Sequence, residues 1–342
     1  MSVLITGASG FIGLNLAEAL LERGEEVILL SRRRIVADPN VDQPAPLRAA
    51  GRIFSALPGQ VHSLSVDLLD GDAVSRVMAE YRPEAIVHGA AATPGAGREV
   101  ADARMAVEVN ILGTLNVLEA ARKVSPRRVI SLSSGSVYGE RNAASGALDE
   151  QADVPVPDSV YSITKHASER LALRWRTLWD LDVVVGRVGT VFGPWEWPTG
   201  VRETISPVFQ LTRLALNGKS AVVPVLGKKD WIYSRDIANG IVAMIDAPKL
   251  GHPVYNIGPG KQWTLLDWCS MLASEFPGFA YRLAERGEEG SIFYGTKDRD
   301  PFATARLTED TGFKAAYDVD AAAADYFRWI KSTPDFWTDL EG

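Results

Sequence analysis

Cysteine and histidine are scarce in this chain of 342 residues, which contains one cysteine, Cys269, and four histidines. A single cysteine excludes a disulfide within the chain, and four scattered histidines give no metal-ligand spacing, so we expect no metal site. The formal net charge is −7, and no basic stripe extends beyond the three arginines at 32–34. The charge therefore gives no support for nucleic-acid binding.

Long apolar runs are missing as well. No stretch approaches the roughly 18 consecutive apolar residues that a membrane-spanning helix needs, so we expect no membrane partner. The first apolar run is too short for a signal peptide and leads straight into a glycine turn, which makes a reducing cytoplasm the expected compartment. The chain is long enough for one large domain or two smaller ones.

The first thirteen residues combine a short apolar run at 3–5 with the pattern Gly7-x-x-Gly10-x-x-Gly13, and an amphipathic stretch follows. A buried strand, a tight turn and a helix N-terminus in this order favour a dinucleotide pyrophosphate. We expect Gly7 to make the turn, Gly10 to let the phosphates approach, and Gly13 to let helix and strand pack closely. The same turn supplies three further expected cofactor contacts: Ser9, Phe11 and Ile12.

A second apolar run, residues 27–30, ends in Ser31, Arg32 and Arg33. In sites that prefer NAD, a carboxylate at this strand end binds the ribose 2′-hydroxyl, whereas NADP needs positive charge and no carboxylate. Ser31 stands where the acid is expected, and the arginines can grip a 2′-phosphate through paired hydrogen bonds. The sequence therefore favours NADP over NAD, with a solvated charge run as the alternative interpretation.

Strands and helices alternate through the first half of the chain. Further strands are expected at 61–66, 85–88 and 128–132, and helices at 70–81 and 100–123. Continuous apolar strands that alternate with helices predict the α/β class, with a doubly wound parallel Rossmann sheet. Ligands of such sheets bind beyond the carboxyl ends of the strands.

Small or polar residues follow several of these strands. Asp67 would take the exocyclic amine of adenine, or would cap the helix at 70–81. Alanines after the fourth strand leave room for a flat ligand, whereas His88 before them is expected to be a satisfied core histidine. The cofactor contacts expected at these strand ends are Asp67, Leu68, Ala90, Ala91 and Val188.

The pattern Tyr161-x-x-x-Lys165 opens an expected helix that runs to about Trp179. Residues four apart share one helical face, and an ammonium near a phenol lowers the phenol's pKa from about 10. Tyr161 would then act as a general base near neutral pH, or as a general acid in the reverse direction. Ser134 would donate a hydrogen bond to the substrate oxygen and stabilise charge there.

These motifs together resemble the extended short-chain dehydrogenase/reductase family, of the NAD-dependent epimerase/dehydratase type, over nearly the whole chain. The resemblance rests on the glycine pattern, on residues 133–139 and on the Tyr161 and Lys165 pair. It implies that Ser134, Tyr161 and Lys165 are the catalytic set. It also implies that Asn110 supports a water-linked proton path to Lys165, and that Tyr161 and Lys165 contact the cofactor.

The same resemblance implies a homodimer. Its helices at 100–123 and 158–179 would pack against those of a second copy as a four-helix bundle around a two-fold axis. Closed two-fold dimers of this kind are common among soluble oligomers.

The sequence departs from the family pattern where the substrate is decided. Dehydratases of the family carry an acidic pair after the catalytic Ser or Thr, where this chain has Gly135 and Ser136, so dehydration is not expected. Nucleotide-sugar enzymes usually have Asn at Thr190 and Arg at Lys229, and both changes weaken a pyrophosphate and uracil site. We therefore expect hydride transfer at a secondary alcohol or ketone carbon, with a UDP-sugar epimerase that retains NAD as the alternative. A non-catalytic NADP sensor is a third interpretation.

The rest of the chain is expected to add a smaller, mixed substrate lobe. Residues 1–187 and about 231–258 would form the dinucleotide-binding domain, and about 188–230 with 259–342 would form the lobe. An aromatic side chain there would pack on a sugar ring or acyl chain and an arginine would bind an anion, or both would serve ordinary packing. The expected substrate contacts are Ser136, Thr190, Trp195 and Arg202.

Overall fold

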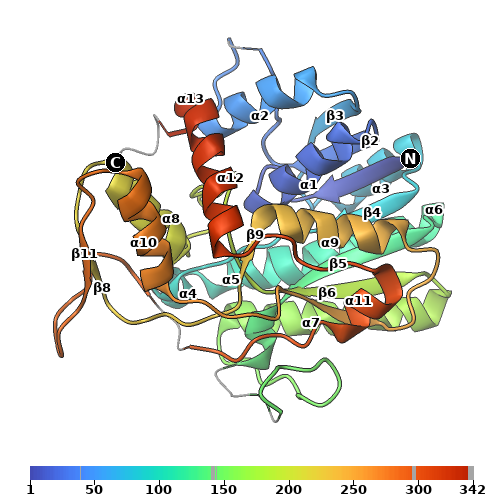
Figure 1. Cartoon of the computed structure of the whole chain (residues 1–342). Coiled ribbons are helices and arrows are strands. Elements are labelled where there is room, and N and C mark those ends of the chain that lie inside the picture. The colour runs from blue at the N-terminus through green and yellow to red at the C-terminus, as the bar shows by residue number, and fades with distance from the viewer. Residues whose placement is uncertain (39, 140–142, 144, 295–297, 338–342) are drawn as a thin grey trace.

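The computed structural model describes residues 1–38, 40–139, 143, 145–294 and 298–337. A parallel sheet of seven strands, in the order β10-β6-β5-β4-β1-β2-β3, lies at the centre of this described part (Figure 1). The strands are β1 (Ser2–Thr6), β2 (Glu26–Ser31), β3 (Gln60–Ser65), β4 (Ala85–His88), β5 (Arg128–Ser134), β6 (Val183–Val188) and β10 (Val254–Ile257). The order reverses beside β1, which places the glycine turn where a doubly wound sheet binds ligands.

Helices cover both faces of this sheet because its strands are apolar on both sides. Val3 and Ile5 belong to a core shared with α1 (Phe11–Glu22) and α9 (Ser234–Asp246). Leu4, between them, faces the opposite core. The helices on that side are α3 (Gly71–Tyr81), α6 (Gly113–Val124) and α7 (Val160–Trp179). The predicted doubly wound Rossmann sheet is confirmed.

The single helix expected over 100–123 is wrong, because the chain breaks it into shorter pieces. Asp102 accepts a hydrogen bond from Met105 N, so its side chain begins a new helix after α4 (Ala96–Ala101). Side chains of this type compete with the helical backbone in this way. The pieces that follow are α5 (Ala103–Val107), a π-helical turn η1 (Glu108–Leu112) and α6.

A smaller group of elements lies to one side of the sheet (Figure 1). It contains two short parallel strand pairs: β7 (Thr190–Phe192) with β9 (Trp231–Tyr233), and β8 (Ala221–Val223) with β11 (Tyr281–Leu283). The helices of this part are α8 (Pro207–Leu216), α10 (Leu265–Glu275), α12 (Val319–Ser332) and α13 (Pro334–Trp337). α13 packs against α2 (Ala45–Ala56), which lies between β2 and β3 in the chain.

One helix departs from the expected division of the chain. α11 (Ala305–Thr311) falls in the segment expected in the substrate lobe, yet it packs against β10 and α9 of the sheet domain. Asp310 accepts hydrogen bonds from Tyr255 Oη and from Gly251 N, which fixes this helix beside the last strand. The boundaries of the two parts therefore interleave more than the sequence predicts.

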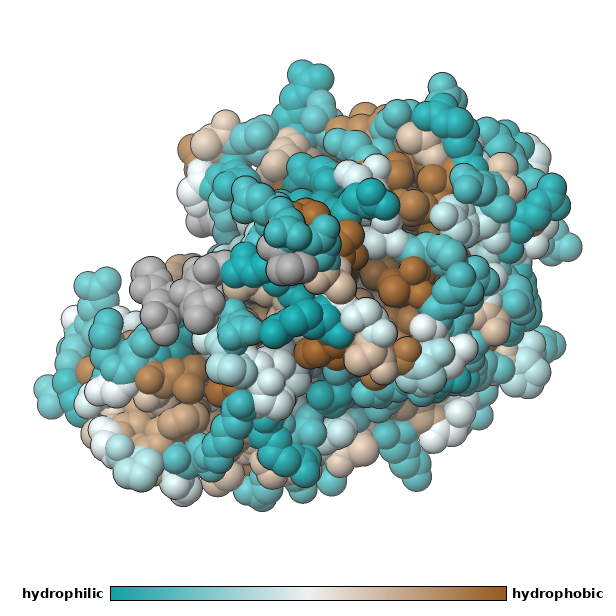
Figure 2. All heavy atoms as spheres, turned by 90° about the horizontal axis from the view of Figure 1, so that it is seen from above, coloured by the Kyte–Doolittle hydropathy of each residue, from teal (hydrophilic) through white to brown (hydrophobic). Residues whose placement is uncertain are grey.

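Figure 2 shows one face, on which apolar residues appear in patches through the middle, with a recess between two bulkier parts. Within the described ranges, no helix combines the length and apolar character needed to cross a membrane.

Candidate active site

The glycine turn between β1 and α1 has the geometry of a phosphate-binding turn. Gly7 adopts φ +71°, and Gly10 N donates to Gly7 O at 2.9 Å. A Cβ on Gly7 would lie 2.6 Å from Ala90 Cα, and one on Gly13 would lie 2.5 Å from Gly7 O. Gly7 therefore makes the turn as predicted, whereas Gly13 allows close contact with the turn itself. This geometry fits a dinucleotide, whose pyrophosphate the N-terminus of α1 would face.

The expected strand-end residues meet beside this turn. Ala90 touches the glycine turn, and Ser134 pairs with Val188 where β5 and β6 end. Asn110 binds the backbone of Ala92 through both side-chain atoms: Oδ1 accepts from Ala92 N at 2.7 Å and Nδ2 donates to Ala92 O at 3.0 Å. Asn110 therefore holds the loop after β4, and it also binds Thr164 of α7.

The end of β2 presents arginines at the surface. Ser31 Oγ donates to Arg33 O at 2.5 Å, and Ser65 Oγ donates to Arg32 O at 3.0 Å. The two hydroxyls thereby fix the backbone of the turn, while the side chains of Arg32 and Arg33 are exposed. Arg33 Cζ lies 6.0 Å from the centre of the Trp197 ring.

The capping role considered for Asp67 is wrong. Asp70 caps α3 by accepting from Ala73 N at 2.9 Å, whereas Asp67 accepts from Leu69 N one turn earlier. Asp67 is exposed after β3, and Leu68 O accepts from Asn116 Nδ2 at 2.8 Å. The exposed carboxylate keeps its position at the expected adenine end of the site.

His88 is a core histidine, as predicted. Thr6 Oγ1 lies 2.7 Å from its Nδ1 and Thr114 Oγ1 lies 2.8 Å from its Nε2, so both ring nitrogens have partners. Complete burial lowers the pKa of His88 to about 3, with a smaller contribution from the charge of Lys165. The neutral ring joins β1, β4 and α6.

Tyr161 lies in the first turn of α7 and meets Ser134 from β5. Ser159 caps this helix by accepting from Ser162 N, and the two side chains form a capping box. Burial raises the pKa of Tyr161, while a hydrogen bond with Ser134 and the charge of Arg202 lower it. Two residues of separate motifs thus come together as predicted.

The ammonium of Lys165 is bound to the central sheet. Its Nζ donates to Leu132 O on β5 at 2.6 Å. Burial lowers the pKa of Lys165 to about 8, against the opposing charge of Glu169. The charge that lowers the pKa of Tyr161 comes from Arg202, and its effect is smaller than those of burial and of the hydrogen bond with Ser134.

Trp195 is not a pocket residue, which corrects the sequence-based expectation. It is fully buried with φ +66°, and its Nε1 donates to Glu18 Oε2 at 2.7 Å. Its ring packs edge-on against Phe54 and Trp329. The neighbouring Trp197 donates to Ser9 O at 3.2 Å and so fastens this segment to the glycine turn.

Arg202 faces the site. Its Nη2 lies 2.6 Å from Oε1 of the buried Glu196, and its Cζ lies 4.8 Å from the centre of the Phe11 ring. Ser136 Oγ donates to Ser134 Oγ at 3.0 Å, which places the second serine at the site too. Thr190 is half-buried in β7, where it pairs with Trp231.

Arg299 and Phe302, which no motif of the sequence indicates, close over Gly135. A Cβ on Gly135 would collide with the Phe302 ring and lie 2.8 Å from Arg299 Nη1. Buried Nε and Nη2 of Arg299 have no hydrogen-bond partner among the described residues. Lys229 lies nearby, and burial together with the charge of Arg299 lowers its pKa to about 8. The small residue after Ser134 is the one sequence signal of this contact.

Comparisons with known proteins agree with this arrangement. Residues 3–258 match the model of the NAD dependent epimerase/dehydratase family. The whole chain is 29% identical to a dTDP-glucose 4,6-dehydratase of Streptomyces niveus, over 96% of that protein. It is 23% identical to a dTDP-L-rhamnose 4-epimerase of Burkholderia thailandensis, over 97% of this chain and 96% of that one.

A solved structure shares the fold over nearly the full length. The UDP-glucuronic acid 4-epimerase of Bacillus cereus, in complex with UDP-glucuronic acid and NAD, matches with a TM-score of 0.77 and 25% identity, over 97% of this chain and 99% of that chain. The motifs, the sheet and these matches show that the chain is an enzyme of the NAD-dependent epimerase/dehydratase family, within the extended short-chain dehydrogenases/reductases.

Proposed function

We propose that this enzyme epimerises a nucleoside diphosphate sugar, with Tyr161 as the general acid/base. One secondary alcohol carbon would be oxidised to a ketone, the sugar would rotate, and the hydride would return to the opposite face of the same carbon. The observation that carries this is the half-buried Tyr161 phenol, which is hydrogen-bonded to Ser134 at the end of β5. The choice of sugar nucleotide is supported by the relatives, which are named for dTDP- and UDP-sugars.

Epimerisation is favoured over dehydration by the residues after Ser134. Elimination of water needs a group that removes and returns a proton next to the oxidised carbon. Gly135 and Ser136 carry no carboxylate for this. Phe302 and Arg299 occupy the space that a side chain at Gly135 would need, so this position has no room for a carboxylate.

Each catalytic residue would have a distinct task. NAD or NADP, held by the glycine turn and the strand ends, would supply the hydride acceptor and donor. Tyr161 would take the proton of the reacting hydroxyl and return it, while Ser134 would donate a hydrogen bond to the same oxygen. Lys165, with its buried ammonium on Leu132 O, would hold the nicotinamide ribose, and Asn110 would hold the loop after β4 in place.

Arg299 and Lys229 would bind the diphosphate of the substrate. Both side chains are largely buried, Arg299 lies near Gly135, and the charge of Arg299 contributes to the lowered pKa of Lys229. Arg299 Nε and Nη2 make no hydrogen bond among the described residues, although Nη2 lies 3.7 Å from Asp230 Oδ1, and such N–H groups suit a pair of phosphate oxygens. Lys229 stands where nucleotide-sugar enzymes usually have Arg, and Arg299 would supply the planar donor set that this position lacks.

The cofactor is proposed to be NADP on the residues at the end of β2. Arg32 and Arg33 are exposed there, and Ser31 replaces the acid that NAD sites use. This feature also favours the second candidate, a dehydrogenase or ketoreductase that exchanges NADP at each turnover. The Bacillus cereus neighbour was solved with NAD, which is the competing cofactor in the test.

Identification of the bound nucleotide separates the two candidates. The purified enzyme is denatured, the released nucleotide is identified, and exchange with added NADP(H) or NAD(H) is followed. A tightly held nucleotide that does not exchange supports the epimerase. Free exchange with a preference for NADP supports the dehydrogenase, and a preference for NAD contradicts the proposal for Arg32 and Arg33.

The variant Tyr161→Phe tests the catalytic assignment. We expect turnover to fall by about a hundred- to ten-thousandfold, as is typical for loss of general acid/base catalysis, with dinucleotide binding retained. The matched control is Tyr281→Phe, which changes a tyrosine of β11. Normal turnover in Tyr161→Phe would contradict the assignment of this residue.

A homodimer through α5, η1 and α7 remains part of the proposal. These elements expose five large apolar side chains at 42–50% of their surface: Val107, Leu112, Ile163, Leu178 and Trp179. Burial of such residues against a second copy would supply the usual driving force for a two-fold interface. Light scattering should give twice the chain mass, and Ile163→Asp should give the monomer; a monomeric wild-type enzyme at micromolar concentration would contradict the dimer.

A further inference from the structure

Three consecutive arginines follow β2, and the structure gives each of them different surroundings. Arg34 Nε donates to Ser63 O at 3.1 Å, which ties this side chain to the neighbouring strand β3. Arg32 is exposed at the surface. The guanidinium of Arg33 lies against an aromatic ring, because its Cζ is 6.0 Å from the centre of the Trp197 ring. The three arginines are therefore not equivalent as partners for a phosphate.

The ring of Trp197 is held against the glycine turn. Its Nε1 donates to Ser9 O at 3.2 Å, and the residue is only 4% exposed. Three residues earlier in the chain, Pro194 O accepts from Asn15 Nδ2 of α1 at 2.8 Å. The indole therefore has a fixed place beside the turn, and contacts other than that with Arg33 keep it there.

The backbone of Arg33 is held as well. Ser31 Oγ donates to Arg33 O at 2.5 Å, and Ala8 N of the glycine turn donates to Leu30 O at 3.3 Å. The turn and the end of β2 are thus joined through the backbone, and Trp197 joins them a second time through the side chain of Arg33. The face of an aromatic ring attracts a guanidinium within about 6 Å of its centre. The indole therefore favours those conformations of Arg33 that stay beside the turn.

We propose that Trp197 is a positioning residue for recognition of the 2′-phosphate of NADP: its ring holds the guanidinium of Arg33 where that phosphate binds. The inference rests on the proposed preference for NADP and deepens it, because it names the arginine that binds the phosphate and the residue that orients it. In this fold the pyrophosphate of a dinucleotide lies at the turn after the first strand, and the ribose 2′-position lies at the end of the second. A guanidinium on a ring face keeps the N–H groups of its edge for two phosphate oxygens.

The positioning residue comes from outside the sheet domain. Trp197 lies between β7 and α8, in the part of the chain that leads into the smaller group of elements. Arg33 is exposed, so without the ring its long side chain would sample many conformations, and binding of a phosphate would have to restrict them. Ordering a side chain before the ligand arrives lowers this entropic cost. The preference for a 2′-phosphate therefore depends on Trp197 as well as on the arginines at the end of β2.

The test uses two probes that differ by one phosphate, adenosine 2′,5′-bisphosphate and 5′-AMP. Their dissociation constants are measured by isothermal titration calorimetry on the full-length protein, after any bound nucleotide has been removed, and the ratio of the two reports on the 2′-phosphate. Arg33→Gln should lower the preference for the bisphosphate about tenfold, because charge-assisted hydrogen bonds are lost. Trp197→Met keeps a large apolar side chain but removes the aromatic face, and should lower the preference about threefold. Neither variant should change the affinity for 5′-AMP.

A double-mutant cycle distinguishes positioning of Arg33 from general damage to the site. In the Arg33→Gln background, Trp197→Met should leave the ratio unchanged, because the ring acts through that arginine. In the Arg32→Gln background, the threefold loss should persist. Two matched controls should leave the ratio at its wild-type value: Arg34→Gln, at the arginine bound to β3, and Trp175→Met, at a half-buried tryptophan in the core on the opposite face of the sheet.

Trp197→Phe decides the test if Trp197→Met does not fold. It keeps a ring but loses the donor to Ser9 O, so the preference for the bisphosphate should fall about twofold. The inference would be overturned by an unchanged ratio in Trp197→Met, or in Trp197→Phe where the first variant does not fold. Equal losses for both probes, or a loss that persists in the Arg33→Gln background, would overturn it too. In each of these cases a wild-type preference that Arg33→Gln abolishes leaves the proposed cofactor standing. A wild-type protein without any preference for the bisphosphate would contradict the proposed cofactor and, with it, the inference.

Discussion

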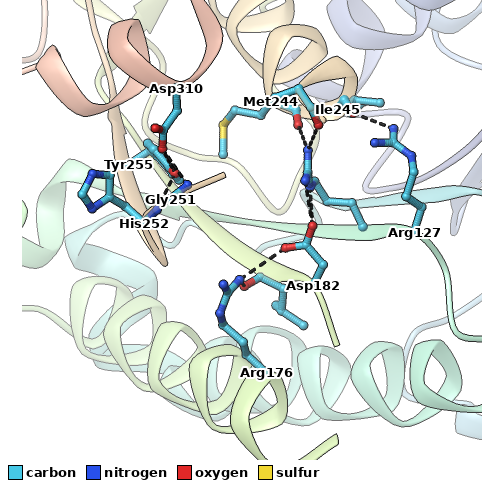
Figure 3. A network of polar contacts seen from close by, with 12 residues as sticks. Arg127, Arg176, Asp182, Met244, Ile245, Gly251, His252, Tyr255 and Asp310 are labelled. Carbon is cyan, nitrogen blue, oxygen red and sulfur yellow. Dashed lines mark hydrogen bonds and ion pairs between the residues drawn. The ribbon is translucent and has the colours of Figure 1, made fainter. Parts of the chain in front are cut away.

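The N–H groups of arginine side chains are bound differently at the two ends of the parallel strands. These ends are the edge of the sheet where the strands begin and the edge where the strands end. At the edge where strands begin, Arg128 is buried: its Nη1 donates to Met244 O and Ala247 O at 2.6 Å, and its Nε donates to Asp182. Figure 3 shows this network, in which Asp182 also binds Arg176. At the edge where strands end, buried N–H groups of Arg202 and Arg299 have no hydrogen-bond partner within the described residues.

The difference separates a structural network from a binding site. A buried donor without a partner costs free energy, so proteins satisfy nearly all of them. At the first edge the donors bind carbonyls at the end of α9, and the carboxylate of Asp182 completes the set. At the second edge the remaining donors stand beside the glycine turn and Ser134, where a phosphate or hydroxyl oxygen would complete them.

The largest effect on stability is expected from Arg128→Met, at the edge where the strands begin. We call this the closed edge, because the arginine donors there have partners, and we call the edge where the strands end the open edge. The substitution leaves the carbonyls of Met244 and Ala247 without their donor and removes one partner of Asp182. Breaking a buried charge network in this way costs about 3–5 kcal/mol in the free energy of unfolding, measured by denaturant titration. Dinucleotide binding by the protein that remains folded should be unchanged.

The control for this prediction is Arg122→Met. Arg122 lies on α6 in a half-exposed pair with Glu119, and such pairs contribute less than about 1 kcal/mol. Equal losses in the two variants would contradict the view that the closed network, and not arginine in general, stabilises this edge.

A smaller effect on stability is expected from His88. This residue lies at the open edge, but both of its ring nitrogens have hydrogen-bond partners. Its folded pKa is about 3 against 6.5 in the unfolded chain, so the unfolded state binds more protons between these values. Stability should therefore fall as the pH drops below 6.5, by about 2 kcal/mol at pH 5. In His88→Gln this part of the pH dependence should be absent.

Denaturant titrations of both proteins at pH 7 and pH 5 check this. The quantity compared is the change in the free energy of unfolding between the two pH values, so a constant cost of the substitution cancels. Equal pH dependence in wild type and variant would mean that His88 is accessible to protons, and the contrast between closed and open groups at this edge would fail.

Much of the sheet half could be predicted from the sequence, because its signals are local. The turn at Gly7 requires a positive φ, and a buried parallel strand reads as a continuous apolar run. The prediction is wrong where a nearby side chain competes for the backbone: Asp102 divides the helix expected over 100–123, and Asp70 instead of Asp67 caps α3.

The site was predictable only where short motifs fix the backbone. Ser134 and Tyr161 meet because the first ends β5 and the second begins α7, and a short motif marks each of these positions. Residue type alone does not show which way a side chain turns, so the sequence predicts Trp195 in the pocket, whereas its partners come from α1, α2 and α12. Arg299 lies far along the chain from Gly135, so no spacing in the sequence indicates their contact.

The smallest effect on stability, and the sharpest test of the open edge, is expected from Arg299→Lys. Lysine keeps the positive charge near the buried Asp230, whose carboxylate lies 3.7 Å from Arg299 Nη2, so the free energy of unfolding should change by less than about 1 kcal/mol. It lacks the planar donor set that would bind the diphosphate, so KM for the nucleotide sugar should rise about tenfold. Arg282→Lys, on β11 and paired with Glu288, should leave KM unchanged. If Arg299→Lys instead lost stability as Arg128→Met does, its guanidinium would belong to the fold, and the two edges would not differ in the way proposed.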